Sequence, residues 1–374
     1  MNENIKTVKE IRHCHNYQLD FLKLVFALCV FVFHSRILSE KGHWIRLMTD
    51  KWGFISVHFF FAVSGMLMIS SFMSKENGRS EKCGKEALNF VFHKFKGIAF
   101  PYYAAFIISF GASVAIEVLN GGSFLKSLGD MFIKSIPEMF LLQNSGISPI
   151  EINTAAWYLS SMLICLLFLN YLLRKNSDFF IYVFSPLAGL LLLGYFYSSG
   201  QPIFPFRSLT GYVNSGLLRG VCGICFGSVS WLISEFLKKR VITNVQRGIV
   251  TATEIVLSLI FAIIWFTRNT DEGTYYPIIL LMPVIIGIIF SDTSFIRDFF
   301  QSKIFRNCGK LSLIIYLNHF VPYRIVQKLE VFRELTYKER FGYMVIFTCI
   351  SILLYFILMK IFKVVAEKVS VNTL

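Results

Sequence analysis

The sequence carries little charge: Asp, Glu, Lys and Arg make up 16% of its 374 residues, whereas about a quarter is usual for soluble domains. Apolar residues make up 55%, and 40 of them are phenylalanine. A chain with so few charged residues is poorly suited to an ordinary soluble domain. The composition predicts an all-α integral membrane protein.

The charge that is present is mostly of one sign, with a net value of +14 at pH 7. Basic patches interleaved with aromatic platforms, which indicate nucleic-acid binding, are missing. Lys and Arg are also the residues that accumulate in the cytoplasmic loops of membrane proteins. We therefore assign the positive charge to membrane topology and expect no nucleic-acid partner.

Cysteine gives no sign of a disulfide framework, because the eight residues are scattered over apolar segments and short connections. Cys222 and Cys225 have the spacing of a redox or metal-binding pair. They lie inside an apolar segment with no second pair, so we interpret them as packing residues and expect no metal. A cleavable signal peptide is also missing, since no small-residue cleavage site follows the first apolar run. We expect this run to remain as a membrane anchor.

Apolar segments of roughly 20 residues are long enough to cross a bilayer as helices. The connections between them are short, which predicts a single membrane domain over residues 1–374 without a fused soluble domain. We expect about ten transmembrane helices, at residues 19–36, 52–73, 98–119, 154–173, 178–198, 212–236, 248–267, 275–291, 310–327 and 341–361.

The distribution of Lys and Arg predicts the orientation. With both termini in the cytoplasm, inner segments hold 22 of the 37 basic residues and outer loops hold 13. The inner segment 74–97 is the most basic. The last outer loop, residues 323–340, is basic against this trend. Positive-inside topology explains the positive charge of segment 74–97. The alternative is a surface that binds an anionic cytoplasmic donor, which would need the same charge.

The first apolar segment contains three ionisable residues, Asp20, Lys23 and His34. Lys23 and His34 are eleven residues apart, so on a helix they share one face about 16 Å apart. Asp20 lies one turn before Lys23 and can pair with it. Ionisable residues inside a span usually serve a site. The alternative is a Lys that reaches the headgroups beside its Asp, with a His at the far interface.

The motif Leu-Asp-x-Leu-Lys, with His34 eleven positions after Lys23, and the run Phe-Phe-Phe-Ala-Val-Ser-Gly at 59–65 resemble the membrane acyltransferase-3 family. In that family a basic residue and a His open the first span. The basic residue is usually Arg, whereas here it is Lys23. The resemblance implies catalytic roles for His34, Lys23 and Asp20. His58 is expected near the depth of His34, as a weaker candidate.

Further motifs extend the resemblance along nearly the whole chain. Lys94 and Lys96 precede Pro-Tyr, like a basic cluster of the family, and are candidate phosphate contacts. Trp157 matches a Trp-x-Leu motif, although it also suits the aromatic belt of a membrane interface. The acidic residue that often follows this motif is missing. The pattern is similar to glycan-modifying members that lack the acid.

Arg219 lies inside a predicted span among Gly216, Gly220, Gly223 and Gly227, whose small-x-x-x-small pairs favour close helix packing. A buried guanidinium needs an anionic partner from the protein or from a ligand. Glu117 is one candidate, and Glu254 suits Arg219 less. The resemblance places Arg219 on the acceptor side.

Ser312, Tyr316 and His319 form one polar stripe on a helix. The family carries a Ser, a Tyr and a His in this arrangement, which implies that the stripe lines the acceptor side. Asn318 with His319 is also similar to the chemistry of the membrane-bound O-acyltransferases, the other large membrane acyltransferase family. That family predicts an essential His319 instead of His34.

The resemblance implies a multi-pass protein of the inner (cell) membrane that moves acetyl from acetyl-CoA to a sugar hydroxyl. The acceptor would be a surface or lipid-linked glycan, with proteins of glycan assembly as partners. A transporter, flippase or glycan polymerase is the alternative, since such proteins also bury His, Arg and Glu in many spans. They usually show paired halves or broken helices in matching positions, which the sequence lacks. The acceptor sugar and the choice between acetyl and succinyl stay open.

Overall fold

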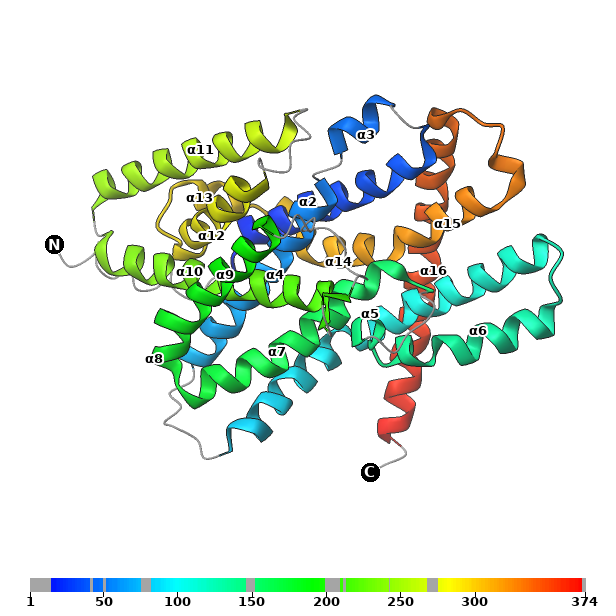
Figure 1. Cartoon of the computed structure of the whole chain (residues 1–374), viewed down its shortest axis with the longest axis horizontal. Helices are drawn as coiled ribbons and strands as arrows, with labels where there is room; N and C mark the ends of the chain where they lie inside the picture. The colour runs from blue at the N-terminus through cyan, green and yellow to red at the C-terminus, as the bar shows by residue number, and fades with distance from the viewer. Residues whose placement is uncertain are drawn as a thin grey trace.

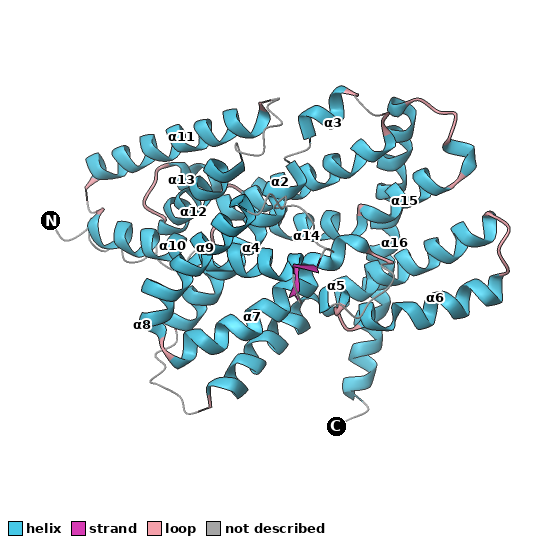
Figure 2. Ribbon diagram, viewed as in Figure 1, coloured by secondary structure: helices cyan, strands magenta, loops and turns pink. Residues whose placement is uncertain are grey.

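The computed structural model is almost entirely helical (Figures 1 and 2). It describes residues 15–40, 43–49, 52–74, 82–145, 152–198, 209–210, 213–241, 243–267 and 275–371. Its longer helices are α2 (Tyr17–Ser35), α4 (Trp52–Met73), α5 (Cys83–Leu119), α6 (Phe124–Met139), α7 (Trp157–Lys175), α9 (Ser185–Ser198), α10 (Ser215–Arg240), α11 (Asn244–Phe266), α12 (Tyr275–Ser291), α14 (Cys308–Asn318) and α16 (Tyr337–Val371). Short elements connect them: α3 (Trp44–Thr49), α8 (Ser177–Phe179), α13 (Ile296–Phe300), α15 (Phe320–Lys328) and the antiparallel strands β1 (Leu209–Thr210) and β2 (Val213–Asn214).

Eight helical segments in the described residues are long and apolar enough to cross a membrane. Helix α12 is apolar but shorter. The all-α multi-pass architecture is therefore confirmed, while the count of ten spans and the orientation of the termini stay predictions. The chain is a multi-pass membrane protein.

The expected segment 310–327 is not one helix, because α14 ends at Asn318 and α15 begins at Phe320. Pro322 lies in the first turn of α15. Proline has no backbone N–H, and its ring would clash with the carbonyl of residue 318 in a continuous helix. The break places His319 at the junction between the two helices.

Helix α5 differs from the expected span 98–119, since it begins at Cys83 and runs for 37 residues. The end of the basic segment 74–97 is therefore helix and not loop. Helix α6 lies beside the second half of α5 (Figure 1), where the Tyr102 hydroxyl donates to the Glu138 carbonyl over 2.6 Å. Helix α6 has 16 residues, and Pro137 lies in its last turn.

The centre of the molecule is the crossing of α4 and α10, where glycines let the two backbones meet. A Cβ added to Gly65 would collide with the Ile224 carbonyl, and one added to Gly227 would lie 2.6 Å from the Gly65 carbonyl carbon. The small residues predicted to serve packing therefore do so. This contact fixes the position of α4 and α10 relative to each other, and with it the residues that both helices present to the site.

We expect Gly227→Ala to lower stability, because its new Cβ meets backbone that cannot move aside. Overpacking of this kind costs about 1–3 kcal/mol. Gly248→Ala in α11 is the matched control, since nothing lies within 4 Å of its added Cβ. Thermal unfolding in detergent should show a lower midpoint for Gly227→Ala only. Equal midpoints for the two variants would show that the crossing tolerates wider spacing.

Candidate active site

His34 and His319 lie side by side, with ring centroids 5.1 Å apart and planes tilted by 37°. His34 comes from the last turn of α2, and His319 from the junction of α14 and α15. Phe320 and Tyr323 also face the His34 ring, at 5.4 and 6.2 Å. A segment 285 residues away thus completes the surroundings of His34.

The His319 ring has a defined tautomer when it is neutral. Its Nδ1 lies 2.8 Å from the Tyr316 carbonyl oxygen. A carbonyl only accepts, so Nδ1 carries the proton and Nε2 keeps its lone pair. This Nε2 is buried and has no hydrogen-bond partner within the described structure, and the same holds for Nδ1 of His34. The rings of His34 and His319 are therefore neighbours, and each has a buried nitrogen without a hydrogen-bond partner in the described residues.

Lys23 is fixed at the opposite end of α2 from His34. Its Nζ lies 2.9 Å from Asp20 Oδ1, which confirms the predicted pairing of the two residues. The Asp20 carboxylate packs at the start of α14, where a Cβ on Gly309 would lie 2.6 Å from its Cγ. A helix N-terminus favours such an anion. His15 Nε2 lies 2.6 Å from the second oxygen of Asp20.

Lys94 and Lys96 point in different directions from α5. Lys94 is half-buried, and its ammonium group is close enough to that of Lys23 for the two to repel each other. Lys96 is exposed, and its Nζ lies 4.7 Å from the Phe92 ring centroid. Lys23 and Lys94 therefore form one cationic end of the site, and Lys96 is not part of it.

Arg219 is 1% exposed, on α10. One of its nitrogens donates to the Phe54 carbonyl over 2.6 Å, and its guanidinium lies over the rings of Phe54 and Trp157 at 5.7 and 5.4 Å. Its Nε is buried without a partner in the described residues. The expected acid partner is not found: Glu117 is exposed, and Glu254 accepts from Gln18 over 2.5 Å.

His58 faces α10 and not His34. Its ring lies 6.1 Å from that of Phe226, and it lies within the electrostatic reach of Arg219. The side chain is 1% exposed and neither ring nitrogen has a partner among the described residues. His58 and Arg219 thus form a second buried polar group, separate from the His34–His319 pair.

The hydroxyls of the polar stripe on α14 contact backbone carbonyls. Ser312 Oγ donates to the Lys23 carbonyl over 2.9 Å, and the Tyr316 hydroxyl donates to the Ala155 carbonyl over 2.6 Å. These two bonds hold α14 against α2 and against the short turn Thr154–Ala156 that precedes α7. Ser312 and Tyr316 therefore position α14 in the site. His319, the third residue of the stripe, keeps its Nε2 without a hydrogen-bond partner in the described residues.

A buried anchor that the sequence analysis missed supports this alignment. The Glu138 carboxylate accepts from the backbone N–H groups of Ile152 and Asn153, each over 2.6 Å. The Asn153 side chain in turn donates to the Leu317 carbonyl over 2.9 Å. The anchor thereby fixes the segment before Trp157. An acid at the end of an amphipathic segment gave no sequence signal of this role.

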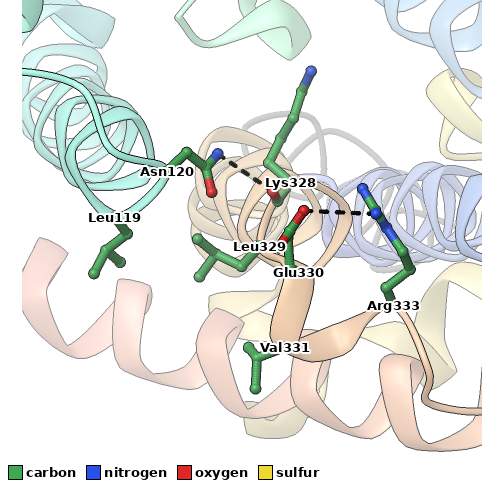
Figure 3. A pocket seen from close by; sticks show the side chains of 7 residues that line it. All are labelled: Leu119, Asn120, Lys328, Leu329, Glu330, Val331 and Arg333. Atoms are coloured by element: carbon green, nitrogen blue, oxygen red, sulfur yellow. Dashed lines mark hydrogen bonds and ion pairs between the residues drawn. The ribbon is translucent and has the colours of Figure 1, made fainter.

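Two other features lie away from the residues described so far. A surface pocket of about 550 Å³ is lined by residues at the end of α5 and after α15 (Figure 3). None of the predicted site residues lines it. Cys222 lies against α9, with its Sγ 3.5 Å from the Gly189 carbonyl oxygen, and the described residues contain no cluster of His, Cys, Asp and Glu that could hold a metal.

The structure is a multi-pass helical bundle in which the half-buried His34 meets the buried His319. Its class comes from the comparison with known families, in which a family model described as an acyltransferase domain matches residues 16–360. The chain belongs to this family, acyltransferase-3. No curated protein and no solved structure matches it.

Proposed function

We propose that this protein transfers acetyl from acetyl-CoA to a sugar hydroxyl of a cell-surface or lipid-linked glycan, in the inner (cell) membrane. The observation that carries the proposal is the contact of half-buried His34 with buried His319 inside a member of an acyltransferase family. Acyl transfer to a hydroxyl requires a base that removes its proton. Proteins of glycan assembly would supply the acceptor.

In the proposed reaction His34 takes the proton of the acceptor hydroxyl while the oxygen attacks the thioester carbonyl. The C–S bond of the donor then breaks, and the coenzyme A thiolate recovers the proton from the imidazolium. The products are the O-acetyl sugar and free coenzyme A. His319 would orient His34, because the bond to Tyr316 holds its Nε2 as an acceptor. Nearby dipoles and cations would stabilise the developing oxyanion.

The cationic end formed by Lys23 and Lys94 fits the anionic part of the donor. It lies about 16 Å along α2 from His34, a length that a pantetheine arm can cover. Phosphates bound at Lys23 would thus leave the thioester within reach of the histidine pair. Asp20 keeps the Lys23 ammonium in place.

The test of the proposed function uses membranes that contain the protein, an acceptor-rich glycan fraction and acetyl-CoA labelled in the acetyl group. Label should appear in extracted glycan and should depend on the protein. A transporter or polymerase would move or extend glycan without acetyl-CoA. Label missing from glycan, with the protein well expressed, would exclude acetyl transfer and favour the transport alternative.

We expect Lys23→Met to raise the KM for acetyl-CoA about tenfold, the effect of losing one charge-assisted contact. The KM for the acceptor should stay unchanged. Lys23→Arg should keep most of the affinity, because it preserves the charge. Lys85→Met is the control, since Lys85 is exposed near the start of α5. A normal donor KM in Lys23→Met would remove Lys23 from the donor site.

A further inference from the structure

Four phenylalanine rings gather at the N-terminal end of α2, and the proposed reaction gives them no role. Phe299 and Phe300 come from α13, and Phe305 comes from the 3₁₀ helix Lys303–Asn307. The centroids of these three rings are 4.6–5.6 Å apart. Phe21 of α2 joins them, 5.3 Å from Phe300 and 5.4 Å from Phe305. We call these four rings the aromatic cluster.

One ring of the aromatic cluster is open to its surroundings. Phe299 is 70% exposed, whereas Phe21, Phe300 and Phe305 are half-buried. The neighbouring rings therefore hold the exposed one in place. A fixed aromatic face of this kind can stack on another planar ring, such as a nucleotide base.

Three cations lie in the same stretch of chain as Phe305. Lys303, Arg306 and Lys310 are all exposed, and the described part of the chain shows no ion pair for any of them. Guanidinium and ammonium groups are the usual protein contacts of phosphate. The stretch thus combines an aromatic surface with charge that suits a phosphorylated ligand.

The acids of the region do not neutralise these three cations. Asp292 pairs with Arg297 over 3.2 Å, and Asp298 pairs with Arg247 over 3.3 Å. Residues 299–310 contain no further Asp or Glu. The stretch therefore keeps a local excess of positive charge, which attracts anions.

The aromatic cluster borders the end of the site proposed for the donor. Phe21 directly follows Asp20, whose carboxylate holds Lys23. Phe305 lies four residues before Gly309, where an added Cβ would be 2.6 Å from Asp20 Cγ. On the predicted topology this end of α2 and residues 292–309 also lie on the same, cytoplasmic side. A ligand on the aromatic cluster could thus extend to Lys23.

We infer that the aromatic cluster and the three cations bind the adenosine 3′-phosphate end of acetyl-CoA. The adenine ring stacks on Phe299, and the 3′-phosphate binds Lys303, Arg306 and Lys310. The diphosphate then lies at Lys23, and the pantetheine arm follows α2 toward His34. This inference rests on the proposed function, which names acetyl-CoA as the donor.

Aromatic and basic residues at a membrane surface also bind anionic lipid headgroups. The donor is favoured here because Phe21 joins the aromatic cluster to the helix that carries both Lys23 and His34. A base stacked on these rings lies in line with the rest of the donor, whereas a lipid contact requires no such alignment.

The test compares coenzyme A with 4′-phosphopantetheine, which lacks the adenosine and its phosphates. Binding is measured with the purified full-length protein in nanodiscs of phosphatidylcholine. Coenzyme A should bind about tenfold more tightly or better. Phe299→Ala should weaken coenzyme A binding about tenfold, the effect of losing one stacked base. Its binding of 4′-phosphopantetheine should stay unchanged, which also shows that the variant is folded.

A second variant tests the phosphate contact. Lys303→Gln, Arg306→Gln and Lys310→Gln together should remove the preference for coenzyme A over dephospho-coenzyme A, which lacks only the 3′-phosphate. Phe236→Ala with Arg240→Gln is the matched control. Phe236 is 57% exposed, and the Arg240 guanidinium lies 5.2 Å from its ring centroid, at another helix end on the predicted cytoplasmic side. This control should bind all three probes like the parent protein.

Equal binding of coenzyme A and 4′-phosphopantetheine would overturn the inference, as would unchanged coenzyme A binding by Phe299→Ala or its loss of both probes. The aromatic cluster would then be a contact for lipid headgroups. Labelled glycan formed equally well from acetyl-CoA and acetyl-phosphopantetheine would also overturn it, while supporting the proposed function. Coenzyme A binding that depends on Phe299, without label in glycan, would support the inference and count against the proposed function alone.

Discussion

His34→Ala should lower acetyl transfer to glycan by about 10²–10⁴-fold, the range for loss of a general base. The protein should still fold, because Nδ1 of His34 has no hydrogen bond to lose in the described structure. The KM values for both substrates should change little, since the imidazole acts on the proton in transfer and does not anchor either substrate. The measurement is the initial rate of labelled glycan formation, normalised to protein level.

Two further variants make this result specific. His93→Ala removes an exposed imidazole of α5 and should keep the full rate. His319→Ala should reduce the rate strongly but less than His34→Ala, because it removes the residue that orients the base. Near-normal transfer by His34→Ala together with none by His319→Ala would exchange the two roles. That outcome would agree with the chemistry of the membrane-bound O-acyltransferases.

Apolar segment length predicted most of the fold. The long apolar runs form helices. A bilayer contains no water to hydrogen-bond the backbone, and a helix satisfies the N–H and C=O groups of its own backbone. The exceptions follow from local chemistry that a length criterion ignores. Pro322 divides one expected span, and α5 extends through the mixed charged and apolar residues before Pro101 back to Cys83.

In the candidate site, contacts within one helix could be predicted from the sequence, whereas contacts between helices could not. Asp20 and Lys23 are three residues apart on one helix, so spacing alone predicted their ion pair. The contact of His34 with His319 joins distant segments, and helical periodicity says nothing of which helices become neighbours. Sequence spacing placed His58 near His34 in depth, whereas its ring turns toward α10.

Arg219→Met should separate function from stability. Arg219 is a buried cation with no acid partner in the described structure. Burying an unpaired charge costs several kcal/mol, and apolar replacement of buried charges is often neutral or stabilising by about 1–4 kcal/mol. The variant loses the bond to the Phe54 carbonyl and the contacts with two rings, which offsets part of this gain. We expect its thermal midpoint to equal or exceed that of the parent protein.

Transfer by Arg219→Met should nevertheless fall by at least 100-fold, the typical effect of removing one group that stabilises developing charge. Arg174→Met is the matched control, because Arg174 is also mostly buried but pairs with Glu86. Its removal leaves that carboxylate unpaired, so the midpoint should fall while the rate per folded molecule stays normal. A lower midpoint for Arg219→Met with normal transfer would make Arg219 a structural residue. A stable but inactive variant would show that the fold tolerates this buried charge because an anionic group of the reaction binds it.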